Sequence, residues 1–497
     1  MAKPKNKGLS YILIFFGLIF AGVLTMAAIL VLSPEKRIGN YTWIDENFNS
    51  KSLVSEDIAE TPFDDIVINS NFYKVIVTER DAISPLSSFN LFLSSKLMGI
   101  VNYQTALTTY TFEIDANNDL VFNFTSLPSG GILFNKDSCV LNLVTYKSHE
   151  EWHTKKITIK TTSGSVVLGG GDVGNLLAQD LIVGSAEVET ENGNITLSSK
   201  FNSTGAIILK TNSANININN SLTPTAFAVE NLTGNVKMAE NTTITASEIS
   251  FDGNIAFYDM QNLVGTVQIR TTSGLIKVVK ITGSVNCEDT MDLTNIVFGE
   301  VTGEFTVSSA TLSDVTISKA GGPITINNES GLVNISNTSG FVYIRTTSGD
   351  ITLSEVSSEL DLQTVSGDIN VNYKDALESC AVGNLTTEKG KIIVTKAVGI
   401  INATATGNGT INVGFSKTIG QSKLQSSSGK IETQISVVAS NQFVLKTQSS
   451  GAVSVDLGSY ISTQSEETIK AINGYEGSEN QIYLLSASGA ITCRTLA

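Results

Sequence analysis

The sequence predicts an all-β, single-stranded β-solenoid (β-helix) that follows an N-terminal transmembrane helix. Three observations lead to this fold class: a short glycine phrase that returns along the chain, a composition suited to strands and turns, and one uncharged stretch near the start. Charged residues make up 16% of the 497 residues, whereas about 25% is usual. Surface helices depend on Lys, Glu and Arg, so this low charge argues against a mostly helical protein. The net charge of −15 excludes a nucleic-acid binder that works by neutralising phosphates.

The uncharged stretch covers residues 11–32. As a helix it would be about 33 Å long, enough to cross a hydrocarbon core of about 30 Å. Lys3, Lys5 and Lys7 lie in the preceding tail, residues 1–10, which the positive-inside rule places in the cytoplasm. We therefore expect a single-pass protein of the cell membrane whose C-terminal part is extracytoplasmic. The alternative is a cleaved signal peptide, although its apolar core is usually only about 7–15 residues long.

Two less regular regions follow the span. Residues 33–60 are expected to form a polar linker, and residues 61–156 an N-terminal β-rich part with a cap. Within that part, alternation predicts two strands over 63–77 and marks two further strand-like segments, 119–125 and 139–146. The apolar stretch within 82–112 predicts either one short helix or a cap over the first coil.

A glycine repeat organises residues 157–497, the predicted solenoid domain. KTTSGSVVL at 160–168 returns as RTTSGLIKV at 270–278 and RTTSGDITL at 345–353, with weaker copies in between and beyond. The glycines recur every 9–10 residues or at multiples of this spacing. Such units bury their apolar face only by stacking, which predicts a solenoid with one core. The spacing leaves open a coil of about 18–20 residues with two strands and one of about 27–30 with three.

Alternation within each repeat predicts which side chains are buried. The second and fourth residues after the glycine are aliphatic, as in Ile351 and Leu353, and the third is polar, as in Thr352. Cys287 and Cys493 occupy the fourth position and are expected to be small buried residues rather than ligands. The chain ends within a motif copy, which predicts that the last coil exposes an edge that invites pairing.

The phrase FDDIVI at 63–68, followed by TTSGDITL and TVSGDINV, resembles the bacterial putative adhesin family. That family is a β-solenoid domain of unknown function related to the head-GIN group. The resemblance covers residues 63–495, and the SGDI phrases are its most specific part. It implies a right-handed β-helix-like body on the cell envelope and brings no catalytic residues with it. Irregular gaps and the apolar insert near 82–112 depart from the family pattern.

Two motifs suggest chemistry but lie in the wrong context. His149-Glu150-Glu151-Trp152-His153 matches the zincin pattern H-E-x-x-H, in which two histidines on one helix face bind zinc. Strand-like segments flank it closely, so we expect a hairpin or loop there. Residues 169–174 match G-x-G-x-x-G, yet no dinucleotide-binding helix follows, and a solenoid turn is expected.

Asp350 and Asp368 are 18 residues apart, each directly after a repeat glycine. In a coil of 18 residues they would stack about 5 Å apart. Paired carboxylates could bind calcium or perform acid–base chemistry on a glycoside. We expect solvated turn carboxylates instead, because basic groups such as Arg270 and Arg345 are scattered.

The sequence therefore predicts a membrane-anchored, extracytoplasmic adhesin or interaction scaffold that is not an enzyme. We expect no catalytic residues, no cofactor and no metal ligands. The expected partners are the membrane, through the N-terminal helix, and a protein or glycan ligand at a surface. The alternatives are a polysaccharide-acting β-helix enzyme and an envelope sensor module.

Overall fold

The computed structural model describes the chain in segments, and every structural statement below concerns these residues. They are 15–22, 24–25, 28, 37–38, 41–52, 65–71, 74–80, 89–102, 111–124, 132–135, 140–146, 156–170, 180–288, 293–310, 313–375, 381–436, 443–458, 461–464, 469–472 and 480–496. Two compact units are present, the first made by residues 1–205 and 209–211, the second by 206–208 and 212–497.

Strands form nearly all of the described structure. The first unit contains β1 (Arg37–Ile38), β2 (Tyr41–Ser52), β3 (Ile66–Ser70), β4 (Lys74–Arg80), β5 (Phe89–Asn102), β6 (Thr111–Ile114), β7 (Leu120–Phe124), β8 (Ile132–Asn135), β9 (Val140–Tyr146), β10 (Lys156–Thr161), β11 (Val166–Leu168), β12 (Leu181–Val183), β13 (Ser185–Thr190), β14 (Ile195–Leu197) and β15 (Phe201–Ser203). Residues of β16 (Ile207–Thr211) fall in both units.

The second unit contains the remaining strands. They are β17 (Ile216–Ile218), β18 (Ala226–Met238), β19 (Thr243–Thr282), β20 (Val285–Cys287), β21 (Leu293–Val301), β22 (Phe305–Ala310), β23 (Asp314–Ala320), β24 (Ile324–Asn328), β25 (Val333–Ser336), β26 (Val342–Thr346), β27 (Ile351–Val356), β28 (Leu360–Gln363), β29 (Ile369–Tyr373), β30 (Ala381–Thr387), β31 (Lys391–Ala405), β32 (Thr410–Thr418), β33 (Gln421–Ser426), β34 (Ile431–Ile435), β35 (Phe443–Gln448), β36 (Val453–Asp456), β37 (Ile461–Gln464), β38 (Ile469–Ile472), β39 (Gln481–Ser486) and β40 (Ile491–Thr495).

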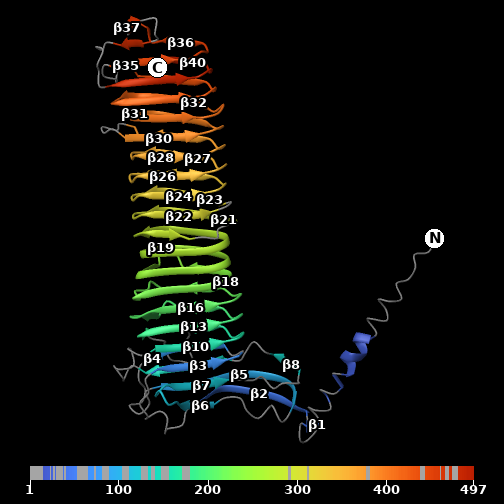
Figure 1. Cartoon of the computed structure of the whole chain (residues 1–497). Coiled ribbons are helices and arrows are strands. Elements are labelled where there is room, and N and C mark those ends of the chain that lie inside the picture. The colour runs from blue at the N-terminus through green and yellow to red at the C-terminus, as the bar shows by residue number, and fades with distance from the viewer. Residues whose placement is uncertain are drawn as a thin grey trace, which may run out of the picture. The chain divides into compact units, whose positions relative to one another are not determined.

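The second unit is a β-solenoid with two strands in each coil (Figure 1). Strands β24, β26 and β28 stack in parallel in one ladder, and β25, β27 and β29 in the other. Val333, Ile351 and Ile369 occupy equivalent places in successive coils, so one coil here contains 18 residues. The two-strand alternative is confirmed, and the three-strand alternative is wrong. All-β, single-stranded β-solenoid is thus the fold class.

Alternating side chains build the core as the repeat predicts. Ile351 and Leu353 are buried and Thr352 between them is half-exposed. Aliphatic side chains of each coil lie directly over those of the next, because the parallel register is kept from coil to coil. Cys287 and Cys493 are buried free thiols within this core, as expected. Burial raises the pKa of the Cys287 thiol to about 12.

A column of glycines runs along one corner of the coils. Gly349 lies over Gly331, and Gly367 lies over Gly349, so closely that a methyl group on either upper residue would overlap the carbonyl oxygen below. Beside this column, the buried Thr364 hydroxyl accepts a hydrogen bond from the Gly367 N–H (3.0 Å) and donates one to the Gly349 carbonyl oxygen (3.3 Å). The repeat phrase T-x-S-G therefore encodes both close approach and a satisfied buried turn.

The order of coils in space departs from the order in sequence at the C-terminal side of the second unit. Strand β39 pairs with β33 on one side and β35 on the other, and β40 likewise lies between β34 and β36. Residues 481–495 are therefore inserted between two earlier coils. The prediction that the last coil exposes an edge is wrong, because both of its strands have neighbours on both sides.

The first unit shows the same arrangement at its N-terminal side. Strand β3 lies between β7 and β10, and β4 lies between β9 and β11, all in parallel. The two strands predicted over 63–77 are thus present, and they form the second coil of this unit rather than the first. The strand-like segments 119–125 and 139–146 correspond to β7 and β9.

Antiparallel strands cover the outermost coils. In the first unit β6 pairs with β7, and β5 pairs with β9, β8 and β2. The stretch within 82–112 thus contributes a covering strand, in place of the helix that was the alternative. Strands β1 and β2 fall inside the region expected to be a linker. In the second unit β38 pairs antiparallel with both β35 and β37.

Within the N-terminal stretch, residues 15–22 are helical and their side chains are exposed. The described residues include no helix that is both long enough and apolar enough to span a bilayer.

The glycine column yields a stability prediction. Replacing Gly367 with Ala should lower stability by about 1–3 kcal/mol, because the added methyl group must push two backbones apart. Thermal unfolding followed by circular dichroism measures the effect. Gly414→Ala is the matched control, since a methyl group there would lie 3.7 Å from its nearest neighbour, the Val394 carbonyl oxygen. Equal midpoints for the two variants would contradict the close-approach explanation.

Candidate functional site

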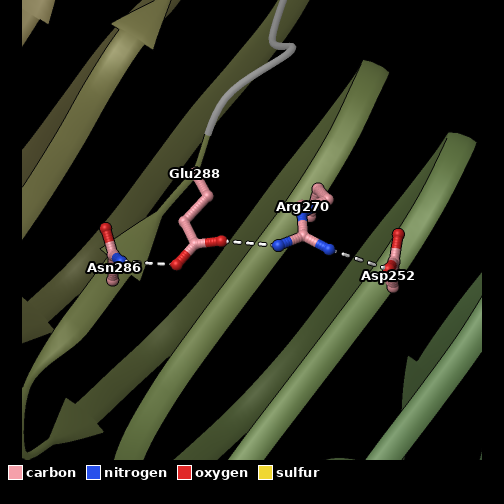
Figure 2. Close-up of polar contacts among 4 residues, drawn as sticks. All are labelled: Asp252, Arg270, Asn286 and Glu288. Carbon is pink, nitrogen blue, oxygen red and sulfur yellow. Dashed lines mark hydrogen bonds and ion pairs between the residues drawn. The ribbon is translucent and has the colours of Figure 1, made fainter.

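The candidate site is the outward surface of the second unit, where side chains of equal position in successive coils form rows. Figure 2 shows one row across three coils, with Arg270 between Asp252 and Glu288. The Arg270 guanidinium lies 3.3 Å from the Asp252 carboxylate and 2.6 Å from that of Glu288, to which Asn286 also donates at 2.9 Å. Hydrogen bonding to Glu288, aided by the charge of Asp252, raises the pKa of Arg270 above its ordinary value.

A second row runs along the neighbouring ladder. Glu300 accepts a hydrogen bond from Lys319 (2.8 Å) and lies 3.1 Å from Lys280, and the three residues are partners in the parallel register of β19, β21 and β23. The hydrogen bonds from Lys319 and Lys280 hold the pKa of the Glu300 carboxyl below its ordinary value. Exposed ion pairs of this kind contribute little individually, so we assign them to the order of the surface rather than to the stability of the fold.

Arg345 makes the most closely held contact of these rows. Its guanidinium carbon lies 4.2 Å from the centre of the Tyr343 ring, and its nitrogens donate to the carboxylate (2.8 Å) and the carbonyl oxygen (3.1 Å) of Asp361. The planar guanidinium suits stacking and forked hydrogen bonding at once. An aromatic ring and a charged group are thereby presented together on the strand face.

Asp350 and Asp368 are close in space, as the 18-residue spacing predicts, and each has a structural partner. The Asp350 carboxylate accepts a hydrogen bond from the Asp368 backbone N–H, and the Asp368 carboxylate accepts one from that of Lys391, both at 2.7 Å. Asp65 does the same for the N–H of Lys156 in the first unit, at 3.0 Å. The aspartates of the FDDIVI and SGDI phrases therefore hold one turn to the next.

The two sequence motifs are only partly visible. His149, Glu150, Glu151, Trp152 and His153 lie outside the described residues, as do Gly171 to Gly174. Gly169 is described: its φ is +72° and its N–H donates to the Val77 carbonyl oxygen at 2.8 Å, in keeping with a turn. Over the segments that the structure describes, no three His, Cys, Asp or Glu side chains gather as a metal site would need.

The cross-coil charge rows were missed by reasoning from sequence. Asp252, Arg270 and Glu288 are spaced by 18 residues, the length of one coil, and that signal was available. It becomes legible only once the two-strand coil is known, because a three-strand coil would place these residues on different faces.

Comparisons with known proteins place part of the second unit in context. Residues 259–383 match the family model described as Toastrack DUF4097, and this stretch holds Arg270, Arg345, Asp350 and Asp368. A solved structure described as a putative cell adhesion protein from Clostridium sporogenes is 9% identical and covers 90% of this chain and 99% of its own, with a TM-score of 0.16. So low a score carries no argument about this chain. No curated protein matches the sequence.

Asp350 provides a test of the turn assignment. Asp350→Ala should cost about 1 kcal/mol, because the Asp368 N–H loses its acceptor. Asp350→Asn keeps an oxygen at that place and should remain close to the parent chain. Chemical unfolding of the three proteins measures the difference. If both variants lost activity toward a ligand while their stability stayed unchanged, the carboxylate would have a role beyond the turn.

Glu300 predicts a specific dependence on pH. Its folded pKa is lowered, so its ion pairs add stability above the ordinary carboxyl value of 4.5, and this contribution is lost as pH falls through the lower folded value. The gap in melting temperature between the parent chain and Glu300→Gln should therefore be largest at neutral pH and vanish in acid. Glu304→Gln is the control, because Glu304 is exposed and makes no ion pair within the described segments. An unchanging gap across this pH range would contradict the assignment.

Proposed function

We propose that the chain is an interaction scaffold of the cell envelope. Residues 11–32 hold it in the membrane, and the strands that follow present their outward rows to a protein or glycan outside the cell. The proposal rests chiefly on one observation: the outward positions carry charged, amide and aromatic groups in fixed register, as in the row of Asp252, Arg270 and Glu288. Kinship with the head-GIN group belongs to the same proposal.

A rigid, regularly spaced surface suits recognition because its polar groups are already ordered before a ligand arrives. Arg345 is fixed by Tyr343 and Asp361, so it loses little side-chain freedom on binding. The match of residues 259–383 to the Toastrack family is compatible with such a scaffold. The proposal includes no chemical step, since the turn aspartates are engaged with backbone amides.

Anchoring and orientation are tested on the full chain in intact cells. The protein should stay with the membrane after alkaline carbonate extraction, and added protease should digest the portion after residue 60. Recovery in the carbonate supernatant, or protection from protease in intact cells with digestion only after lysis, would overturn this part of the proposal.

Adhesion is tested by comparing cells that carry the full chain with cells that carry residues 1–60 alone. The full chain should increase attachment to immobilised glycans or to a second labelled cell population. Surface amounts are matched by labelling an epitope tag placed within the segment common to both chains. Equal attachment of the two cell populations in every assay would overturn the scaffold role.

A further inference from the structure

The inserted C-terminal coil creates a recess that no other feature of the sequence anticipates. It brings three related turns together: QSSSG at 425–429, LSASG at 485–489 and QSSG at 448–451. A hollow of about 570 Å³ lies over these turns, here called the serine trough. Its lining residues are Gln425, Ser426, Ser427, Gln448, Ser449, Ser450, Leu485, Ser486 and Ala487.

The register explains the shape of the trough. Leu485 pairs with Gln425 on one side and Gln448 on the other, so a half-exposed apolar side chain lies between two exposed amides. Several serine hydroxyls serve the fold: Ser449 donates to the Gly489 carbonyl oxygen at 2.7 Å, and Ser486 accepts from the Gly489 N–H at 2.8 Å. The Gln425 and Gln448 amides make no hydrogen bond within the described part of the chain and offer both donors and acceptors to a ligand.

The next row of the same strands is basic and aromatic. Lys423, Tyr483 and Lys446 are partners in register, and the Lys446 ammonium lies 5.0 Å from the centre of the Tyr483 ring. Strands β33, β39 and β35 contain no acidic residue. Across the described segments neither lysine makes an ion pair, whereas Lys277 pairs with Asp259 and Lys319 with Glu300. In a chain with a net charge of −15, this is a local excess of positive charge.

These groups together select a ligand chemistry. Glutamine amides hydrogen-bond to hydroxyl groups, an aromatic ring offers an apolar face beside a polar tip, and paired ammonium groups attract a carboxylate. We infer that the serine trough, together with Lys423, Tyr483 and Lys446, binds an acidic saccharide, a sugar chain that carries carboxylates. The inference rests on the proposed function, because it names the ligand class of that outward surface.

The experiment uses the full chain in detergent micelles, with a hexamer of galacturonic acid as the probe and maltohexaose as its neutral counterpart. Calorimetry should show binding of the acidic hexamer that weakens as salt is added, and no binding of maltohexaose. The double variant Lys423→Gln, Lys446→Gln should lose about tenfold or more in affinity. Gln425→Ala, Gln448→Ala should also weaken binding, with less change in salt dependence.

The control is Lys277→Gln, which removes an outward lysine from another row and alters the net charge in the same direction. It should bind as the parent chain does, and melting temperatures establish that all variants are folded. Absence of hexamer binding, equal binding of maltohexaose, or equal losses in Lys277→Gln and in the double variant would each overturn the inference. If the hexamer fails to bind while cells with the full chain still adhere, the inference is wrong and the scaffold role stands.

Discussion

The spacing between coils depends on glycine lying over glycine at one corner. Gly367 approaches Gly349 so closely that no side chain fits between them, and the Thr364 hydroxyl joins the same two residues by hydrogen bonds. Thr387 repeats this one coil further on, with Gly390 and Gly367. Because each turn is fixed to the one before it, both ladders keep their register. The buried aliphatic rows and the outward polar rows are consequences of that register.

The interior and the repeat were predictable from sequence because they depend on neighbours within one coil. Glycine spacing located the turns, and alternation assigned Ile351 and Leu353 to the core. The order of coils at the ends was not predictable. Residues 481–495 carry the same apolar pattern as every other coil, so nothing in them says which neighbours they will have. The covering strand β5 was ambiguous for a similar reason, since a long apolar run fits a helix or a strand.

The candidate surface was only partly predictable. The closeness of Asp350 and Asp368 followed from spacing alone, but their engagement with backbone amides required the turn geometry. The row through Arg270 required the coil length, and the serine trough required the inserted coil. Each step from core to surface thus needs more knowledge of which coil lies beside which. Surface chemistry in a repeat fold is the last property that sequence discloses.

The inserted coil at residues 481–495 also bears on how the chain reaches its folded state. A stack whose neighbours follow sequence can grow one coil at a time as the chain leaves the ribosome. Here the final strands β39 and β40 close a gap between coils that were synthesised earlier. Completion of that end must therefore await termination of synthesis, and pairing there joins residues 60 positions apart, as Ile431 with Ile491. Such non-local closure is slow to form, and the finished end is held by the chain's own last residues.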